Sequence, residues 1–433
     1  MDRISLLSDD LLLKILSSLT SKDAVTTSLL SKRWCSLWKF TPRLVYLDLM
    51  YKDPNTVYWK ASRFVDKFLL LHKAPVLESV LLIVDRNCCP TDIETWISVA
   101  SSRVLRNLYC CRYRPGSEPI RLPRDLYTCA TLVSLNLQAE FILDYVPLTT
   151  CFPSLKVLIL YLVKFSSEEI AGRFFSGCPV LEDLRLVRGT NDNLKTFTIA
   201  VPSLRRLSII DLNCGSHFPG DDVGFVINAP SLKSLTIANQ FTWCYSLVKM
   251  PYLVKADIKL RQGDSKMFEG WLISAKHVSL CLHPPTDSCP LGVFSQLVSL
   301  NLCTCSLDWF RLILNHTPKL RVLRFELKQV RLHSKVKPLQ KCYSSSVDVQ
   351  TQWEQPSSVP QCLASSLETV EWIDYKGTQA EKKVAMYLLE NSGQLKKMRI
   401  RPSKSTNDSE KLKMLQELSS TPRSSSKCRL SFI

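Results

Sequence analysis

The sequence predicts an α/β protein with a short helical segment, a long array of helix–strand repeats and a C-terminal part of mixed helices and strands. Three observations lead to this prediction. Leucine and isoleucine crowd the first residues at helical spacing, a pattern ending in two alternating leucines returns through the middle, and helical and strand-like stretches alternate again near the C-terminus. The chain has 433 residues, enough for two or three domains or one long repeat array.

Seventeen cysteines raise the question of disulfides. Acidic residues interrupt the first apolar stretch, "MDRISLLSDD", which is untypical of a secretory leader, and no run of about 18 apolar residues predicts a membrane span. We therefore expect reduced, small and buried thiols in a protein of the nucleus or cytoplasm, away from membranes. The cysteine pairs lack zinc-site spacing, so neither a metal nor a cofactor is expected.

The formal net charge is +17 at pH 7. A basic balance of this size fits acidic protein partners or nucleic acid. The basic residues are dispersed and aromatic residues do not interleave with them in one stripe, which favours protein partners. The run "KLRVLRFELKQVRLHSKVKPLQK", residues 319–341, keeps nucleic-acid binding open as the alternative.

The stretch "ISLLSDDLLLKILSSL", residues 4–19, predicts a first helix. Ser8 can cap it, and Asp9 and Asp10 fall in the first turn, where the helix dipole favours acids. One face carries apolar residues at positions i, i+3, i+4 and i+7, with two further leucines beside it: Leu12, Ile15, Leu16 and Leu19, then Leu11 and Leu13.

A second helix is predicted to follow, with Thr20 and Asp23 as a possible capping box. Its apolar residues are Val25, Leu29, Leu30, Trp34, Leu37 and Trp38, interrupted by the polar stretch 31–33. So short a segment cannot bury this much apolar surface internally. Either the rest of the chain covers it, or another protein does.

This opening segment resembles the plant F-box along its whole length. Ser8 stands where the family usually has proline. The resemblance implies docking on a Skp-type adaptor and, through it, a cullin. The implied adaptor-binding residues are Leu7, Ser8, Leu11, Leu12, Ile15, Leu16, Leu19, Val25, Leu30, Trp34 and Trp38.

A pattern of the type "CATLVSLNL" or "APSLKSLTI" returns from residue 74 onward. Its leading leucines fall at Leu77, Leu105, Leu132, Leu155, Leu181, Leu204, Leu232, Leu253, Leu297, Leu320, Leu367 and Leu395. With His277 in the slot before Leu297, the spacing is that of leucine-rich repeats, about 20–29 residues. One interval of 47, between Leu320 and Leu367, indicates a missed unit or an insertion.

The unit "SSEEIAGRFFSGCPVLEDL" illustrates the predicted plan of helix, turn and short strand. It has capping serines, acids in the first turn, and Gly177 and Pro179 after the helix. Because unit lengths vary, we expect an irregular arc. The outward strand positions are candidates for target binding, but no substrate-binding residue is assigned: Lys156, Glu182, Asp183, Arg185, Arg205, Lys233, Asn301, Arg321 and Arg324.

The last part of the chain follows a polar stretch at residues 333–359, read as a loop or linker. Its order of strand, helix, strand and helix resembles the FBD domain that follows the repeats in many plant F-box proteins. The resemblance rests on Tyr375, Gly377, Glu381, 389–391, 395–398, Leu418, 422–425 and Cys428.

Phosphate loops, nucleophile elbows and zinc-protease motifs are absent from the sequence, and the six histidines are scattered. We therefore expect no catalytic residues. The predicted architecture is an N-terminal helical F-box (1–45), an irregular leucine-rich-repeat solenoid (46–332), a polar loop or linker (333–359) and a C-terminal α+β FBD-type domain (360–433).

The F-box resemblance implies a non-catalytic subunit of a Skp–cullin–F-box ubiquitin ligase, with the repeats binding an unknown target protein for ubiquitination. We expect a monomer within that complex. The alternative is a basic repeat scaffold that binds nucleic acid or another protein without ligase assembly, and a small-molecule pocket in the repeats stays open.

Overall fold

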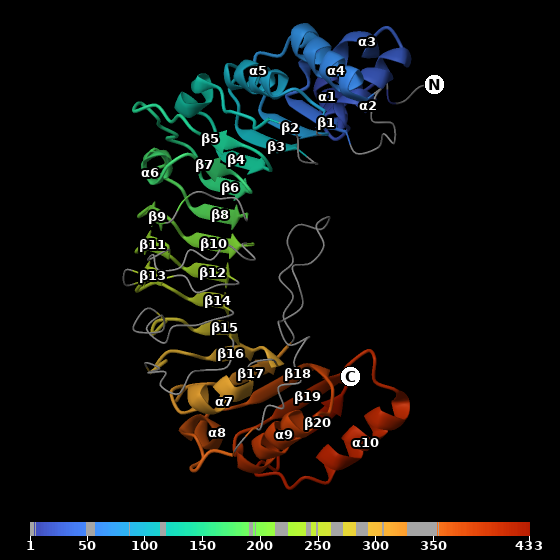
Figure 1. The fold of residues 1–433 in the computed structure, drawn as a ribbon. Coiled ribbons are helices and arrows are strands. Elements are labelled where there is room, and N and C mark those ends of the chain that lie inside the picture. Colours follow the sequence, from blue (N-terminus) through green and yellow to red (C-terminus); the bar gives the residue numbers. More distant parts are fainter. Residues whose placement is uncertain are drawn as a thin grey trace. The chain divides into compact units, whose positions relative to one another are not determined.

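The computed structural model describes residues 4, 6–48, 57–85, 87–112, 118–189, 194, 196–212, 224–239, 244–247, 250–260, 272–282, 293–304, 307–326, 353 and 355–433. The chain divides into two compact units, Met1–Ala229 and Pro230–Ile433, each with its own parallel strands (Figure 1). The boundary between the units falls inside the predicted repeat region.

The first unit contains parallel strands that pair in chain order. They are β1 (Arg43–Leu47), β2 (Ser79–Val84), β3 (Asn107–Arg112), β4 (Ser134–Gln138), β6 (Val157–Tyr161), β8 (Asp183–Arg188) and β10 (Arg206–Asp211). Shorter parallel pairs are β5 (Ile142–Leu143) with β7 (Lys164–Phe165), and β9 (Thr196–Ala200) with β11 (Gly224–Asn228).

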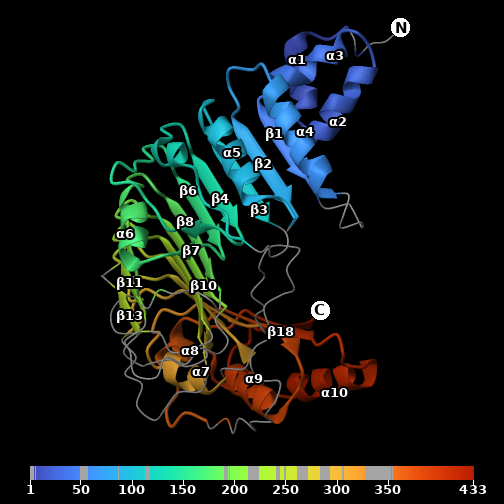
Figure 2. The same cartoon turned by 45° about the horizontal axis from the view of Figure 1, so that its top comes forward.

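Most helices of the first unit lie toward its start, and α6 lies farther along it (Figure 2). The α-helices are α1 (Asp9–Leu16), α2 (Ser21–Thr26), α3 (Trp34–Leu37), α4 (Val57–Leu71), α5 (Pro90–Ser101) and α6 (Glu168–Ser176). Short 3-10 helices are η1 (Thr27–Leu29), η2 (Trp38–Phe40) and η3 (Arg124–Thr128). The predicted second helix is therefore wrong as one element, because the polar stretch 31–33 separates η1 from α3.

The second unit repeats the parallel plan. Its strands are β12 (Ser234–Asn239), β13 (Cys244–Leu247), β14 (Lys255–Leu260), β15 (His277–Leu282), β16 (Ser299–Leu302), β17 (Val322–Phe325), β18 (Thr369–Tyr375), β19 (Lys397–Pro402) and β20 (Arg429–Phe432). Its helices are α7 (Leu307–Leu314), α8 (Gln361–Ser365), α9 (Gln379–Asn391) and α10 (Asp408–Ser419).

The predicted leading leucines form the core of both units. Every one of the twelve is at most 1% exposed, and each lies two residues before the start of its strand. The prediction for His277 is wrong, because His277 is exposed and begins β15. Ala275, which is 0% exposed, fills the leading position instead. Ala275 could not be predicted from the spacing of the leading leucines, because it is not a leucine.

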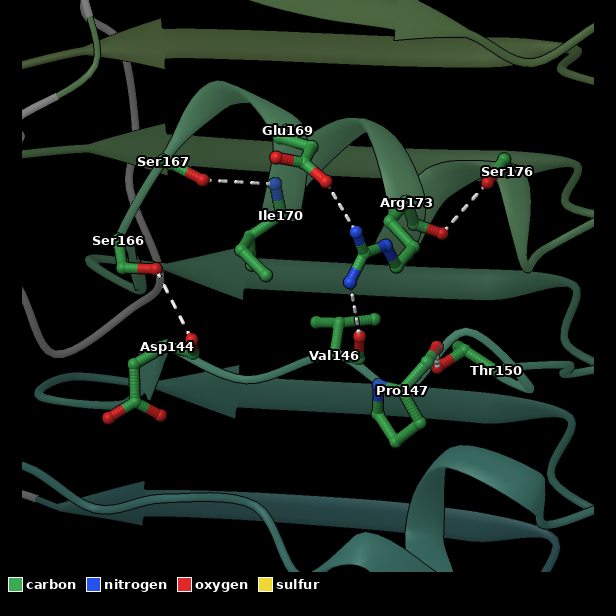
Figure 3. Close-up of polar contacts among 10 residues, drawn as sticks. All are labelled: Asp144, Val146, Pro147, Thr150, Ser166, Ser167, Glu169, Ile170, Arg173 and Ser176. Carbon is green, nitrogen blue, oxygen red and sulfur yellow. Dashed lines mark hydrogen bonds and ion pairs between the residues drawn. The ribbon is translucent and has the colours of Figure 1, made fainter.

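The unit around α6 confirms the predicted helix–turn–strand plan (Figure 3). The Ser167 side chain accepts from the Ile170 N–H at 3.2 Å and so caps the helix. Arg173 forms an i,i+4 ion pair with Glu169 and donates to the Val146 carbonyl at 3.0 Å. Because Val146 belongs to the preceding repeat, this hydrogen bond connects successive units.

The interval of 47 residues between two leading leucines is an insertion and not a missed repeat. β17 pairs directly with β18, with Val322 opposite Thr369, so no strand lies between them. Of the predicted linker 333–359, only residue 353 and residues 355–359 are described. Likewise, the basic run 319–341 is described only to residue 326.

The C-terminal part contains mixed helices and strands, as predicted, and β18, β19 and β20 extend the parallel pairing from β17. A capping box between Thr378 and Glu381 starts α9. Just before it, Gly377 has φ +68°, and a Cβ there would lie 2.6 Å from the Met414 side chain. The turn into α9 therefore requires glycine.

We expect Gly377→Ala to lower the free energy of unfolding by about 1–2 kcal/mol, because an L-residue is strained at this positive φ. The measurement is chemical or thermal unfolding of the full chain.

Gly172→Ala is the matched control for Gly377→Ala. Gly172 lies inside α6, and a Cβ there would meet nothing within 4 Å, so alanine should raise stability by up to about 1 kcal/mol. Equal effects of the two substitutions would contradict the backbone argument.

Candidate functional site

The described part of the chain offers no metal site, since no group of three or more His, Cys, Asp or Glu side chains could hold an ion there. Most cysteines in this part are buried, as predicted; burial raises the pKa of Cys178 to about 12. Among these residues, no helix is both long and apolar enough to cross a bilayer.

The interior of the opening segment contains four of the predicted adaptor-binding residues. Leu12 is 0% exposed, Leu16 1%, Trp34 4% and Trp38 6%. These side chains join α1 to α3 and η2 within the chain, so in this structure they are not accessible to a partner. They hold the exposed residues of the opening segment in place.

The outer surface of the opening segment carries the other predicted residues. Leu11 is 48% exposed, Ile15 42% and Leu30 68%, while Ser8 is exposed and Leu7, Leu19 and Val25 are partly exposed. Two residues that the prediction omitted are more exposed still, Leu6 at 78% and Leu29 at 84%. Their signal in the sequence was present, since each is a leucine next to a predicted one.

Two parallel rows of apolar residues run along α1. Leu12 and Leu16 form the buried row, and Leu11 and Ile15 form the exposed row. Both rows have i,i+4 spacing, so each lies along one side of the helix, offset by one residue. Ile15, placed by its spacing on one apolar face with Leu12 and Leu16, therefore lies in the exposed row and not in the buried one. We call Leu11, Ile15, Leu29 and Leu30 the exposed leucine surface.

The caps of the first helices are only partly as predicted. Thr20 accepts from the Asp23 N–H at 3.2 Å, which confirms the cap of α2. Ser8 occupies the N-cap of α1 but its side chain makes no capping bond, and the prediction that it does so is wrong. The Ser8 side chain is exposed, so water can satisfy its hydroxyl.

Arg33 holds the start of α1 against the start of α3. Its guanidinium donates to the Asp9 carboxylate at 2.6 Å and to the Leu7 carbonyl at 2.6 Å. The Arg33 and Asp9 side chains are 38% and 63% exposed, so the ion pair adds little stability. Its effect is geometric, because it fixes the beginning of the exposed row.

The opening segment is attached to the first repeat through an aromatic stack. The ring centroids of Trp38 and Phe68 lie 5.4 Å apart, and those of Phe68 and His72 also 5.4 Å apart. His72 Nε2 lies 2.7 Å from the Thr41 carbonyl, and Arg103 lies 3.0 Å from His72 Nδ1. An N–H at Nε2 and an acceptor at Nδ1 together require the neutral imidazole.

The environment of His72 also disfavours its charged form. Burial lowers the pKa of His72, outweighing the hydrogen bond to Thr41, which raises it, and the Arg103 charge lowers the pKa further. His72 was not predicted to have a role, since a lone histidine in an apolar stretch gives no specific signal.

The outward strand positions form ion pairs between neighbouring repeats. Glu182 lies between Lys156 at 3.7 Å and Arg205 at 3.8 Å. In the second unit, Glu371 lies between Arg324 and Arg399, and this pairing lowers the pKa of Glu371 despite partial burial. Four of the candidate target-binding residues, Lys156, Glu182, Arg205 and Arg324, are therefore engaged in ion pairs, and the substrate residues stay unassigned.

Comparisons with known proteins find three family models along the chain. Residues 4–45 match the F-box domain, residues 93–256 match the leucine-rich repeats of the FBD-associated F-box protein At5g56370, and residues 355–400 match the FBD domain. The helical opening segment and the stacked repeats thus define an F-box protein of the leucine-rich-repeat class.

Full-length relatives narrow this class. The chain is 66% identical to the FBD-associated F-box protein At5g56440 of Arabidopsis thaliana over the whole of both chains. It is 40% identical to the F-box/FBD/LRR-repeat protein At5g56420 of the same plant, over the whole chain and 99% of the relative. The chain belongs to the F-box/FBD/leucine-rich-repeat family.

We expect the double substitution Leu11→Gln and Ile15→Gln to leave the free energy of unfolding within about 1 kcal/mol of the natural chain, because both side chains already face water. The substitution Leu16→Ala, in the buried row of the same helix, should lower the free energy of unfolding by about 2–5 kcal/mol. Thermal unfolding of the full chain measures both. A large loss of stability in the double variant would mean that this chain itself covers the exposed row.

His72 predicts a loss of stability in acid. Because its pKa is lowered from 6.5 in the folded state, the unfolded state binds the proton more readily. The contribution of His72 is therefore complete above about pH 6.5 and is lost as the pH falls below it. Unfolding of the natural chain and of His72→Gln between about pH 8 and pH 5 should show a smaller loss in the variant. Parallel curves would contradict this role.

Proposed function

We propose that this protein is the non-catalytic substrate-recognition subunit of a Skp–cullin–F-box ubiquitin ligase of the nucleus or cytoplasm. The F-box binds the Skp-type adaptor, and the repeats bind a target protein. The observation that carries the proposal is the exposed leucine surface on a segment whose core, Leu12, Leu16, Trp34, Leu37 and Trp38, is already buried.

The energetics of the exposed leucine surface support a protein partner. Leu29 and Leu30 are 84% and 68% exposed, and no described part of the chain covers them. Full burial of a leucine side chain gains about 1.5–3 kcal/mol. A partner that covers this surface therefore gains affinity without disturbing the core below it, because Leu12 and Leu16 stay where they are.

The attachment of the F-box supports a role in positioning. β1 follows η2 within a few residues and pairs with β2 of the first repeat, with Leu44 opposite Val80. The stack of Trp38, Phe68 and His72 adds a second connection. An adaptor on the F-box would thus be held rigidly against the first repeats. Transfer of ubiquitin belongs to other subunits, and this chain supplies proximity and orientation.

Binding of nucleic acid without ligase assembly is the alternative, motivated by the net charge of +17. Such binding would weaken steeply with added salt, because phosphate contacts release counterions. Adaptor binding through apolar side chains would not.

The proposed docking predicts that substitutions in the exposed row of α1 lower the affinity for the adaptor. Leu11→Gln together with Ile15→Gln should weaken binding to a Skp-type adaptor by about 10–100-fold, because two half-exposed side chains lose their burial in the interface. Isothermal titration of the full chain with purified adaptor measures the effect.

Leu70→Gln is the control for the adaptor experiment, since Leu70 is an 82% exposed leucine on α4, outside the F-box. It should bind as the natural chain does. The proposed docking would be refuted if the adaptor did not bind the natural chain. It would also be refuted if the adaptor bound the natural chain, the double variant and Leu70→Gln with equal affinity.

A further inference from the structure

The last strand of the second unit, β20, has one open edge. It pairs with β19 on one side, and no described strand pairs with it on the other (Figure 1). The Arg429 N–H donates to the Lys396 carbonyl at 3.0 Å, and the Ile433 N–H donates to the Ile400 carbonyl at 3.0 Å. Because backbone direction alternates along a strand, the N–H and C=O groups of Leu430 and Phe432 point away from β19.

The core side chains of β20 are also incompletely covered. Leu430 and Phe432 are partly exposed. Their neighbours in β19, Met398 and Ile400, are 0% exposed. In a stack of repeats each strand is covered by the next one, and β20 lacks this cover among the described residues.

Basic side chains line the outward face next to this edge. Lys397, Arg399 and Arg401 alternate along β19 and are exposed, and Arg429 of β20 lies opposite Lys397. Arg399 pairs with Glu371, while the other three form no ion pair with the described residues. The face therefore presents uncompensated positive charge beside an open strand edge.

We propose that the β20 edge binds an extended acidic segment of a partner protein, which adds to the sheet as a parallel strand. Three features of the edge agree on this occupant. The outward backbone groups supply main-chain hydrogen bonds, Leu430 and Phe432 accept apolar side chains, and the basic face accepts acidic ones. Acidic and apolar residues must alternate in the segment, because neighbouring side chains of a strand point to opposite faces.

Other occupants fit the edge less well. A second copy of the chain would bring two basic faces together, which like charges disfavour. A nucleic acid would satisfy Lys397 and Arg429 but would leave the outward backbone groups and Leu430 without partners. The inference goes beyond the proposed function, because it concerns the C-terminal strands and does not depend on adaptor docking.

The probe is a fluorescein-labelled synthetic peptide of about eight residues in which glutamate alternates with valine, a usual strand length. Anisotropy with the full chain, without adaptor, measures its Kd. In this sheet, the residues whose N–H points back to the preceding strand carry outward side chains, as Arg429 does. In the bound peptide these residues would be the glutamates.

N-methylation therefore provides a matched pair of probes. Methyl groups on the glutamate nitrogens remove the donors that face β20 and should weaken binding at least about tenfold. Methyl groups on the valine nitrogens face away and should have little effect. Equal binding of both methylated peptides would overturn strand addition.

Charge reversal tests the basic face. Lys397→Glu with Arg429→Glu should weaken peptide binding at least about tenfold. Lys383→Glu with Lys413→Glu makes the same change on the exposed sides of α9 and α10 and should leave Kd unchanged. Circular dichroism of each variant confirms that it is folded.

Three further results would overturn the proposal. They are a peptide that does not bind the natural chain, a single-stranded oligonucleotide that binds this face more tightly than the peptide, and self-association of the chain that Lys397→Glu with Arg429→Glu abolishes.

Discussion

The stacking of parallel strands is the interaction on which the rest of the structure depends. A single repeat exposes one side of its strand, and only the next repeat can cover it. Twelve leading leucines at 1% exposure or less show how completely this is achieved within the two units. The first strand of a stack has no preceding repeat to cover it and therefore needs cover from another element. At β1 the F-box meets this need: α2 packs on the strand, and the Ser21 hydroxyl accepts from the Val45 N–H at 2.9 Å.

The buried and the exposed apolar rows of α1 are offset by only one residue. α1 has eight residues, too few to be stable alone in water. Its buried row, Leu12 and Leu16, supplies the tertiary packing that makes it a helix, and the adjacent row, Leu11 and Ile15, stays exposed. Because both rows belong to one rigid element, the outer row is pre-organised, and little conformational entropy has to be lost when a partner covers it.

Sequence reasoning predicted the repeats well, because their signal is periodic. It found the twelve leading leucines and the cap of α6, but it missed Ala275, whose small side chain fills the same slot. It also could not tell which of two adjacent apolar rows on α1 is buried, since Ile15 and Leu16 are chemically alike and only tertiary packing distinguishes them. The Ser8 cap failed for a similar reason, because an exposed hydroxyl has water as an equally good partner.

The direct pairing of β17 with β18 has a consequence for how this family can vary. The Arg321 carbonyl accepts from both Glu368 N–H at 2.9 Å and Thr369 N–H at 3.0 Å, so the two ends of the long insertion are fixed by the sheet itself. Closing a longer flexible loop costs only about 0.6 kcal/mol for each doubling of its length. Insertions and deletions at this one junction therefore leave the register of every strand unchanged, and evolution can alter the length here at almost no thermodynamic risk.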